Sequence, residues 1–256
     1  MFIDTHTHIY LEKFDKDRET CIKEALDAGV EKLYLPNIDL SSIEQIKRCI
    51  ESYPDLCIPM MGLHPCSVSS EYEDVLKTLE TELDSYPYVA VGEIGLDYYW
   101  SKDLIEEQKI AFQRQIEWAC SRSLPIIIHS RDSLDDCIDM IDQCTDNSLT
   151  GIFHCFSGTV EQAERIIKLG FLMGIGGVVT FKNSGLADVV SKIPIEYLVL
   201  ETDAPFLAPH PFRGKRNEPK FIPIIAEKIA EAKDMELVDV ERKTTENALL
   251  LFGHSK

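Results

Sequence analysis

Leu124-Pro125-Ile126-Ile127-Ile128-His129 is an unbroken apolar run that stops at an imidazole. A strand with one face in water alternates apolar and polar residues, whereas a parallel strand buried on both faces is apolar throughout. The run therefore predicts a buried parallel strand. His129 would then lie at the carboxyl edge of the sheet.

The same pattern recurs along the whole chain at intervals of roughly 20 to 35 residues, the length of a strand and its crossover helix. The predicted strands are Met1–Thr5, Lys32–Pro36, Leu56–Gly62, Tyr88–Glu93, Leu124–His129, Thr150–His154, Phe171–Gly176 and Glu196–Glu201. The predicted helices include Asp15–Ala28, Ser41–Glu51, Glu71–Ser85, Lys102–Arg122, Lys220–Lys233 and Leu237–Gly253. A doubly wound open sheet also alternates in this way, but eight units favour closure. We predict the α/β class, with a single (β/α)8 TIM barrel and an extra C-terminal helix.

Length and composition limit the other possibilities. A chain of 256 residues with 45% hydrophobic content suits one barrel of about 250 residues, so we expect a single domain over residues 1–256. There are 44 acidic against 26 basic residues, a net charge of −18, which repels nucleic acid and acidic membranes at long range. A polyanionic substrate would therefore need a local positive site.

The cysteines and the N-terminus predict a location. None of the eight cysteines forms a C-x-x-C pair, and a chain of this size needs no disulfides. A polar His-x-His starts at residue 6, where a signal peptide would be apolar, and no apolar run approaches the ~20 residues of a membrane span. We expect a reduced cytoplasmic protein that does not enter a membrane.

Six side chains suited to metal binding lie at or just past the ends of five of these predicted strands. They are His6, His8, Glu93, His129, His154 and Asp203. In a parallel barrel the carboxyl ends of all the strands open onto one rim, so these residues would converge there. Such a set can bind a pair of divalent cations and activate water for hydrolysis.

Each of these signals also has a plainer interpretation. His6 and His8 project to one face at i and i+2, yet two surface histidines near a terminus would look alike. Glu93 has a glycine on each side and two oxygens able to bridge two cations, or it is an ordinary loop acid. His129 and His154 are either ligands or core imidazoles bonded to backbone carbonyls. Because all of these residues are expected on one rim, metal binding is the favoured interpretation.

Asp203 can bind a metal and also accept the proton of an attacking water. Glu201 is expected to support a ligating histidine instead. Cys155 should point away from the face that His154 uses and is expected to be a core thiol. His64 is expected on the same rim. It could contact the substrate, donate a proton or be an ordinary loop histidine, and we favour a substrate contact that does not bind metal.

Positive charge near this rim is scarce. Lys182 follows the seventh strand, and the densest basic stretch, Arg213-Gly214-Lys215-Arg216-Asn217, follows the eighth. Such a stretch is often only a solvated loop, but its place after Asp203 favours phosphate binding by Arg213. No Walker loop or dinucleotide fingerprint is present, so no nucleotide cofactor is expected.

A series of motifs, in order along residues 1 to about 250, closely resembles the TatD family of metal-dependent deoxyribonucleases within the amidohydrolase-like TIM barrels. The motifs are Asp4-Thr5-His6-Thr7-His8, Gly62-Leu63-His64-Pro65, Gly92-Glu93-Ile94-Gly95-Leu96-Asp97, His129-Ser130-Arg131-Asp132, His154-Cys155-Phe156-Ser157-Gly158, Thr180-Phe181-Lys182, Glu201-Thr202-Asp203-Ala204-Pro205 and Arg213-Gly214-Lys215-Arg216-Asn217-Glu218-Pro219. No single motif is decisive, whereas the ordered set is highly specific.

The resemblance implies a phosphodiesterase that degrades DNA, as a 3′-to-5′ exonuclease favouring single strands, with a part in DNA repair. It also implies roles by position. One metal would be held by His6, His8, Glu93 and Asp203, and the other by Glu93, His129 and His154, while His64, Lys182 and Arg213 would contact substrate phosphate. Two divalent ions are expected, Mg²⁺ or Mn²⁺, with Zn²⁺ or Co²⁺ also compatible with the histidines.

Two-metal hydrolysis of a phosphodiester by a monomer is thus the expected activity, with Asp203 orienting and deprotonating the water. The nearest alternative is hydrolysis of a C–N or C–O bond on the same barrel, by a deaminase, lactonase or aminoacyl-ester hydrolase. The basic loop that contains Arg213 separates the two, because a neutral amide or lactone does not need it. A binding protein without catalysis is the remaining alternative, and the complete ligand set beside a candidate base disfavours it.

Overall fold

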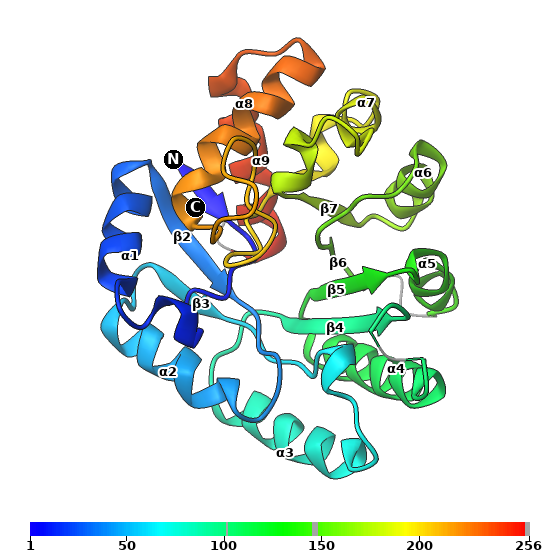
Figure 1. The fold of residues 1–256 in the computed structure, drawn as a ribbon. Coiled ribbons are helices and arrows are strands. Elements are labelled where there is room, and N and C mark those ends of the chain that lie inside the picture. The colour runs from blue at the N-terminus through cyan, green and yellow to red at the C-terminus, as the bar shows by residue number, and fades with distance from the viewer. Residues whose placement is uncertain (101, 145–147, 254–256) are drawn as a thin grey trace.

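The structure is a computed structural model that describes residues 1–100, 102–144 and 148–253. Parallel strands form the centre of the molecule and helices surround them (Figure 1). The strands are β1 (Phe2–Asp4), β2 (Val30–Leu35), β3 (Cys57–Pro59), β4 (Val91–Asp97), β5 (Ile126–Arg131), β6 (Gly151–Phe153), β7 (Leu172–Ile175) and β8 (Leu198–Leu200). Ile126, Ile127 and Ile128 are completely buried, as the apolar run predicts.

Two arcs of strands, β1-β2-β3 and β4-β5-β6-β7-β8, close into one ring. At the first junction the Gly92 N–H donates to the Met61 carbonyl at 2.9 Å. At the second junction the Thr5 N–H donates to the Leu200 carbonyl at 3.0 Å, and Thr7 forms a parallel bridge with Ala204. Closure leaves no open sheet edge at these junctions, and the predicted TIM barrel is confirmed.

The helices that cover the barrel are α1 (Arg18–Asp27), α2 (Ser42–Ser52), α3 (Tyr72–Ser85), α4 (Ile105–Arg122), α5 (Leu134–Asp142), α6 (Val160–Lys168), α7 (Leu186–Val190), α8 (Ile222–Lys233) and α9 (Leu237–Leu251). Short 3-10 helices occupy Glu12–Phe14, Pro65–Ser67, Gly177–Thr180, Ile195–Tyr197 and Pro219–Phe221. No helix within the described ranges is both long and apolar enough to cross a bilayer.

The extra helix α9 contacts β1 and β8 and packs on residues of the barrel interior. Phe252, directly after α9, stacks on Tyr34 of β2 with 3.9 Å between ring centroids. Ala248 and Phe252 belong to one buried cluster with Ile3, Ile58 and Ile127. The helix therefore closes the end of the barrel opposite the functional rim, in agreement with the prediction of an extra C-terminal helix.

The predicted end of the fourth strand is wrong, and so is that of the fifth. β4 continues to Asp97 and β5 to Arg131, so Glu93 and His129 lie inside strands rather than after them. Polar residues at these positions predict strand ends, but in the structure the Glu93 and His129 side chains contact each other while the backbone pairing of β4 with β5 continues. Gly95 makes this possible, because a Cβ there would lie 2.1 Å from the His129 carbonyl oxygen, and its φ is +131°.

Candidate metal centre

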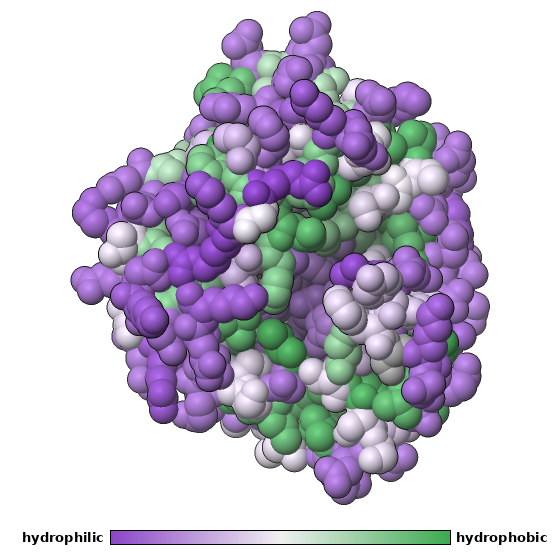
Figure 2. Space-filling view, in the orientation of Figure 1, coloured by the Kyte–Doolittle hydropathy of each residue, from purple (hydrophilic) through white to green (hydrophobic). Residues whose placement is uncertain are grey.

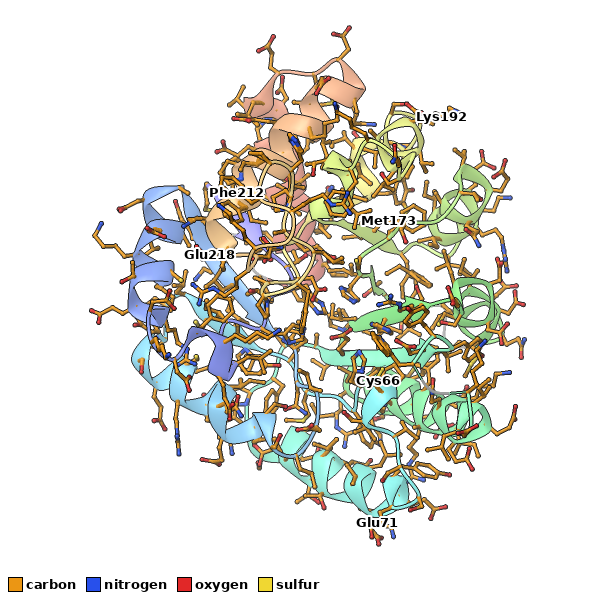
Figure 3. All side chains as sticks on the ribbon, in the orientation of Figure 1. Cys66, Glu71, Met173, Lys192, Phe212 and Glu218 are labelled. Carbon is orange, nitrogen blue, oxygen red and sulfur yellow. The ribbon has the colours of Figure 1, made fainter. Side chains whose placement is uncertain are left out.

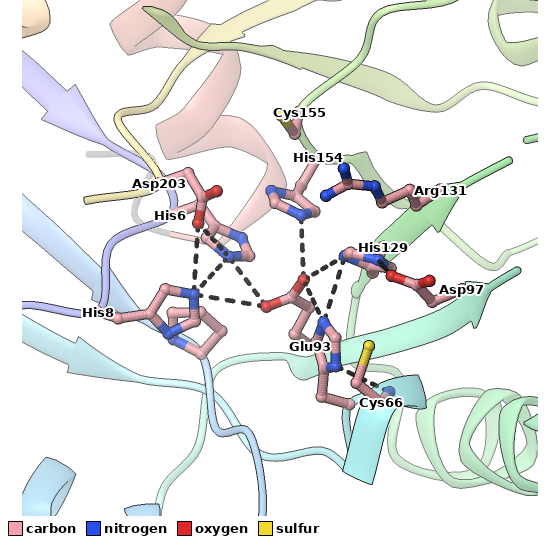
Figure 4. A network of polar contacts seen from close by, with 12 residues as sticks. His6, His8, Cys66, Glu93, Asp97, His129, Arg131, His154, Cys155 and Asp203 are labelled. Carbon is pink, nitrogen blue, oxygen red and sulfur yellow. Dashed lines mark hydrogen bonds and ion pairs between the residues drawn. The ribbon is translucent and has the colours of Figure 1, made fainter. Parts of the chain in front are cut away.

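The rim at the carboxyl ends of the strands surrounds a hollow with a hydrophilic floor (Figure 2). Loops after β3 and β8 contribute to this face, and among their side chains Cys66, Phe212 and Glu218 can be located in Figure 3. At the floor lies Glu93 of β4, whose side chain is buried. Its carboxylate is the centre around which the histidines are arranged (Figure 4).

One group of donor atoms surrounds Oε2 of Glu93. This oxygen lies 3.2 Å from Nε2 of His6 and 3.5 Å from Nε2 of His8, and the two imidazole nitrogens are 3.3 Å apart. Oδ1 of Asp203 completes the group, 3.5 Å from Nε2 of His8 and 3.8 Å from Nε2 of His6. Four ligands at about 2.1 Å from one cation in a tetrahedron are separated by about 3.4 Å, so this spacing suits a single ion.

A second group surrounds the other oxygen of the same carboxylate. Oε1 of Glu93 lies 2.9 Å from Nδ1 of His129, 3.0 Å from Nε2 of His154 and 3.3 Å from Nε2 of His64. Both groups together bring all six predicted metal ligands to one place. Glu93 is the residue that they share, with one oxygen facing each group.

The charge state of the two carboxylates suits cation binding. Burial alone would raise the pKa of Glu93, but His64, His154 and His6 around it hold that pKa well below its ordinary value. Burial also opposes ionisation of Asp203, yet its contact with His8 and the nearby His154 lower its pKa. Both groups are therefore anionic at neutral pH.

The ring nitrogen that carries the proton is set by hydrogen bonds behind His8. The Tyr10 hydroxyl donates to the Pro36 carbonyl at 2.6 Å, which uses its only proton. The 2.8 Å contact between that hydroxyl and Nδ1 of His8 must then be donated by the imidazole. Nδ1 carries the proton, and the lone pair of Nε2 faces Glu93 and Asp203.

Asp97 performs the same task for His129 and was not identified from the sequence. Its Oδ2 lies 2.9 Å from Nε2 of His129. Burial opposes the ionisation of Asp97, but hydrogen bonds from His129 and from the backbone of Trp100 and Tyr99 bring its pKa below its usual range. An ionised carboxylate accepts, so Nε2 donates to Asp97, and in the neutral ring the lone pair of Nδ1 is then turned toward Glu93. The signal was present in the motif Gly95-Leu96-Asp97, where the β4 alternation continues.

Glu201 lies behind His154, where its Oε1 is 3.4 Å from Nδ1 of the imidazole. The same oxygen accepts the Cys155 N–H at 2.6 Å. Burial disfavours the charged form of His154, but Glu93 and Glu201 on its two sides raise its pKa well above the ordinary value. Glu201 thus directs Nδ1–H backward and Nε2 toward Glu93, the supporting position expected from the sequence.

His64 has the opposite tautomer. Its Nδ1 accepts the Cys66 N–H at 3.0 Å, so in the neutral ring the proton resides on Nε2. Burial lowers the pKa of His64 and favours this neutral form. The nitrogen that faces Glu93 is therefore a donor rather than a lone pair. With all four rings neutral, this sets His64 apart from His8, His129 and His154, and it suits a contact to substrate better than a bond to a metal.

The basic residues divide into two kinds. Arg213 is exposed after β8, and its guanidinium lies 4.2 Å from the centroid of Phe181, the neighbour of exposed Lys182 after β7. Neither Arg213 nor Lys182 forms a hydrogen bond or ion pair with the metal-centre residues in the described structure. Arg216 has a structural role, because it pairs with Asp17 at 2.7 Å and with Glu218 at 2.9 Å.

Cys155 is not the core thiol that strand alternation predicts. It is half-buried and lies outside the hydrophobic core clusters. The reason is local, because β6 ends at Phe153 and Cys155 has a left-handed φ of 48°. Alternation of side chains between faces holds only while the backbone stays extended.

We expect Asp97→Asn to weaken metal binding by roughly 10- to 100-fold, as removal of a hydrogen-bond partner of a ligating histidine does in other metal sites. The amide would donate toward Nε2 of His129 and so transfer the ring proton to Nδ1, which faces Glu93. Mn²⁺ titration calorimetry measures the change in affinity. The matched control is Asp74→Asn, which changes an exposed carboxylate on α3. Equal affinities of the Asp97 variant and wild type would contradict this role.

Residues 3–253 match the sequence model of a family described as TatD related DNase. The chain is 40% identical over 253 residues to YabD of Bacillus subtilis (strain 168), named an uncharacterized metal-dependent hydrolase, and the match covers 98% of this chain and 99% of YabD. It is 30% identical over 256 residues to a protein of Pantoea ananatis (strain LMG 20103) named 3′-5′ ssDNA/RNA exonuclease TatD, with 98% of each chain covered.

Among solved structures, the crystal structure of YjjV, a TatD homologue from Escherichia coli K12, superposes with a TM-score of 0.93. The two chains are 31% identical, and the superposition covers 98% of each. The likeness therefore includes the barrel strands and the rim loops that together carry the metal-centre residues.

Proposed function

The chain belongs to the TatD related DNase family and is a metal-dependent hydrolase, and from this premise we propose that it hydrolyses phosphodiester bonds in single-stranded nucleic acid. The observation that carries the proposal is the single Glu93 carboxylate shared by two groups of donors, His6, His8 and Asp203 on one oxygen and His129 and His154 on the other. Two cations held by one carboxylate would suit the attacking and leaving oxygens of a phosphoryl centre.

The names of several relatives support a nucleic acid substrate, whereas the net charge of the chain opposes one and must be offset at the site. Several relatives about 30% identical to this chain, including the Pantoea ananatis protein, are named 3′-5′ ssDNA/RNA exonucleases. The chain has a net charge of −18, so a polyanion needs local positive charge to approach. Two divalent ions, with Arg213 and Lys182 on the rim, would provide it.

In this proposal His6, His8, Glu93 and Asp203 hold one divalent ion, and Glu93, His129 and His154 hold the other. When bound, such ions supply Lewis-acid chemistry, since they polarise phosphoryl oxygens and make water acidic enough to attack near neutral pH. Mg²⁺ or Mn²⁺ is the proposed pair, with Zn²⁺ or Co²⁺ as alternatives.

The other steps belong to the side chains. Asp203 is ionised and 14% exposed, so it is placed to orient the attacking water and accept its proton. Nε2–H of His64 donates to an oxygen of the phosphoryl group, because its tautomer is fixed by the Cys66 N–H. Arg213 and Lys182 offset negative charge that develops on the nonbridging oxygens.

The finer properties that we propose are 3′-to-5′ digestion of DNA, a part in DNA repair, a cytoplasmic location and a monomeric, single-domain chain. The direction follows the exonuclease names of the relatives. The barrel is closed by its own ninth helix and needs no second copy to complete the described site.

The direct test is digestion of single-stranded DNA labelled at either the 5′ or the 3′ end, with Mg²⁺, Mn²⁺ or EDTA. We expect metal-dependent shortening from the 3′ end. Intact DNA with every metal, for protein shown to be folded and metal-loaded, would overturn the proposal and direct the search to esters, lactones and amides.

A further inference from the structure

The exposed aromatic side chains of this protein gather beside the metal centre. In the described part of the chain, three aromatic rings are exposed: Tyr99 (53%), Trp100 (69%) and Phe206 (42%). Tyr99 and Trp100 follow β4, which carries Glu93, and Phe206 comes three residues after Asp203. Large apolar surfaces left in water at one place mark a binding site.

A cation accompanies the first two rings. The guanidinium of Arg131, at the end of β5, lies 4.1 Å from the centroid of Tyr99 and 5.5 Å from that of Trp100. No described carboxylate lies within ion-pair distance of it, so its charge is available. Figure 4 shows the Arg131 side chain extending toward His154 and His129.

The platform of Tyr99, Trp100 and Arg131 is attached to the metal centre through one carboxylate. Oδ1 of Asp97 accepts the N–H groups of Tyr99 and Trp100, both at 2.9 Å, while its Oδ2 holds His129. The backbone that carries both rings is therefore tied to the carboxylate that also contacts His129.

A second aromatic pair lies beside the other donor group. The Phe206 ring is 6.2 Å from the ring of His8, between centroids, and the Lys13 ammonium is 4.8 Å from the Phe206 centroid. Each group of metal ligands thus has an exposed aromatic ring and a cation next to it.

We infer that Trp100, Tyr99 and Arg131 form a platform on which an unpaired nucleobase stacks next to the scissile phosphate, with Phe206 receiving a base on the other side. The inference rests on the proposed function and adds to it how the substrate is recognised. Every base has a π-face, so stacking of this kind is independent of sequence. It requires bases that are free of a partner strand, because those in a duplex are already stacked, and the structure therefore assigns selectivity for single strands to these rings.

Tryptophan emission tests the inference without any cleavage. The chain has two tryptophans, and Trp118 is 2% exposed, so contact with ligand is reported by Trp100. The probe is a phosphorothioate thymidine octamer, with an abasic octamer of equal charge as its control. We expect the octamer with bases to quench the emission and the abasic octamer to leave it unchanged. In Trp100→Phe this quenching should be absent. Equal quenching by both probes, or none, would overturn the inference.

Kinetics provide the second measurement. Base stacking is worth roughly 5- to 150-fold in binding, so Trp100→Ala should raise KM for a natural octamer by that factor and change kcat less than twofold. Trp100→Phe should restore most of the wild-type affinity. Val238→Ala, which changes an exposed apolar side chain on α9, should leave KM unchanged. An unchanged KM in Trp100→Ala would overturn the inference. If the wild-type protein does not cleave the natural octamer but its emission is quenched by the octamer that carries bases, the proposed function fails and the stacking platform stands.

Discussion

Replacing Asp203 by asparagine is expected to reduce kcat on single-stranded DNA by about 10²- to 10⁴-fold, the usual contribution of a general base. The amide keeps the shape of the side chain but cannot accept the proton of water. It also withdraws one anionic oxygen, now 3.5 Å from Nε2 of His8, from the first donor group. End-labelled DNA digestion at saturating Mn²⁺ measures the loss, because excess metal compensates for weaker binding.

The matched control is Asp55→Asn, an exposed acid between α2 and β3 at the opposite end of the barrel. It makes the same chemical change and should leave kcat unchanged. Circular dichroism and a thermal melt confirm that both variants fold. An Asp203→Asn protein with wild-type turnover would rule out this residue as the proton acceptor and leave Glu93 as the described carboxylate beside His8.

The barrel was predictable from the sequence because its determinants are local. The run Ile126–Ile128 is apolar at every position since one face of β5 lies under the helices and the other faces the barrel interior, and eight such runs leave few arrangements other than a closed ring. The boundaries were less predictable. A charged residue normally ends a buried strand, but Glu93 and Asp97 remain within β4 because imidazoles across the rim compensate their burial.

The donors of the metal centre were also predictable, since each stands within or shortly after the apolar run of a strand. Their hydrogen-bond partners were not. Asp97 and Tyr10 act on imidazoles 32 and 2 residues away, and only the folded backbone shows that their polar atoms point at His129 and His8. The distinction between a histidine that binds metal and one that donates a proton therefore depends on structure.

His64 illustrates this most clearly. As a sequence feature it differs little from the other rim histidines, and in space its Nε2 is as close to Glu93 as theirs. One backbone N–H, that of Cys66, decides its chemistry by occupying Nδ1. The 3-10 turn Pro65–Ser67 positions this group, so the proline after the histidine has a function that composition does not reveal.

The second large effect is expected for Glu93→Gln. An amide has one oxygen and one NH₂ group, so one of the two donor groups would face N–H bonds instead of a lone pair. If the NH₂ replaces Oε2, His6 and His8 lose their shared partner, and if it replaces Oε1, His129 and His154 lose theirs. No rotamer satisfies both sides, so we expect the variant to bind one Mn²⁺ where wild type binds two.

Turnover should fall by at least about 10³-fold, because a bound cation supplies several kcal/mol of charge stabilisation in the transition state. Calorimetry gives the stoichiometry, and the melting temperature gives an independent measure. Metal at 100 times its Kd stabilises a single site by about 2.7 kcal/mol, and the variant should lose the part contributed by one site. Glu31→Gln, exposed at the start of β2, is the control. Two ions bound with undiminished turnover would show that the two donor groups do not share Glu93. Each group of histidines would then need an anionic ligand of its own. For His129 and His154, the carboxylates that the described rim offers besides Glu93 are Asp97 and Glu201.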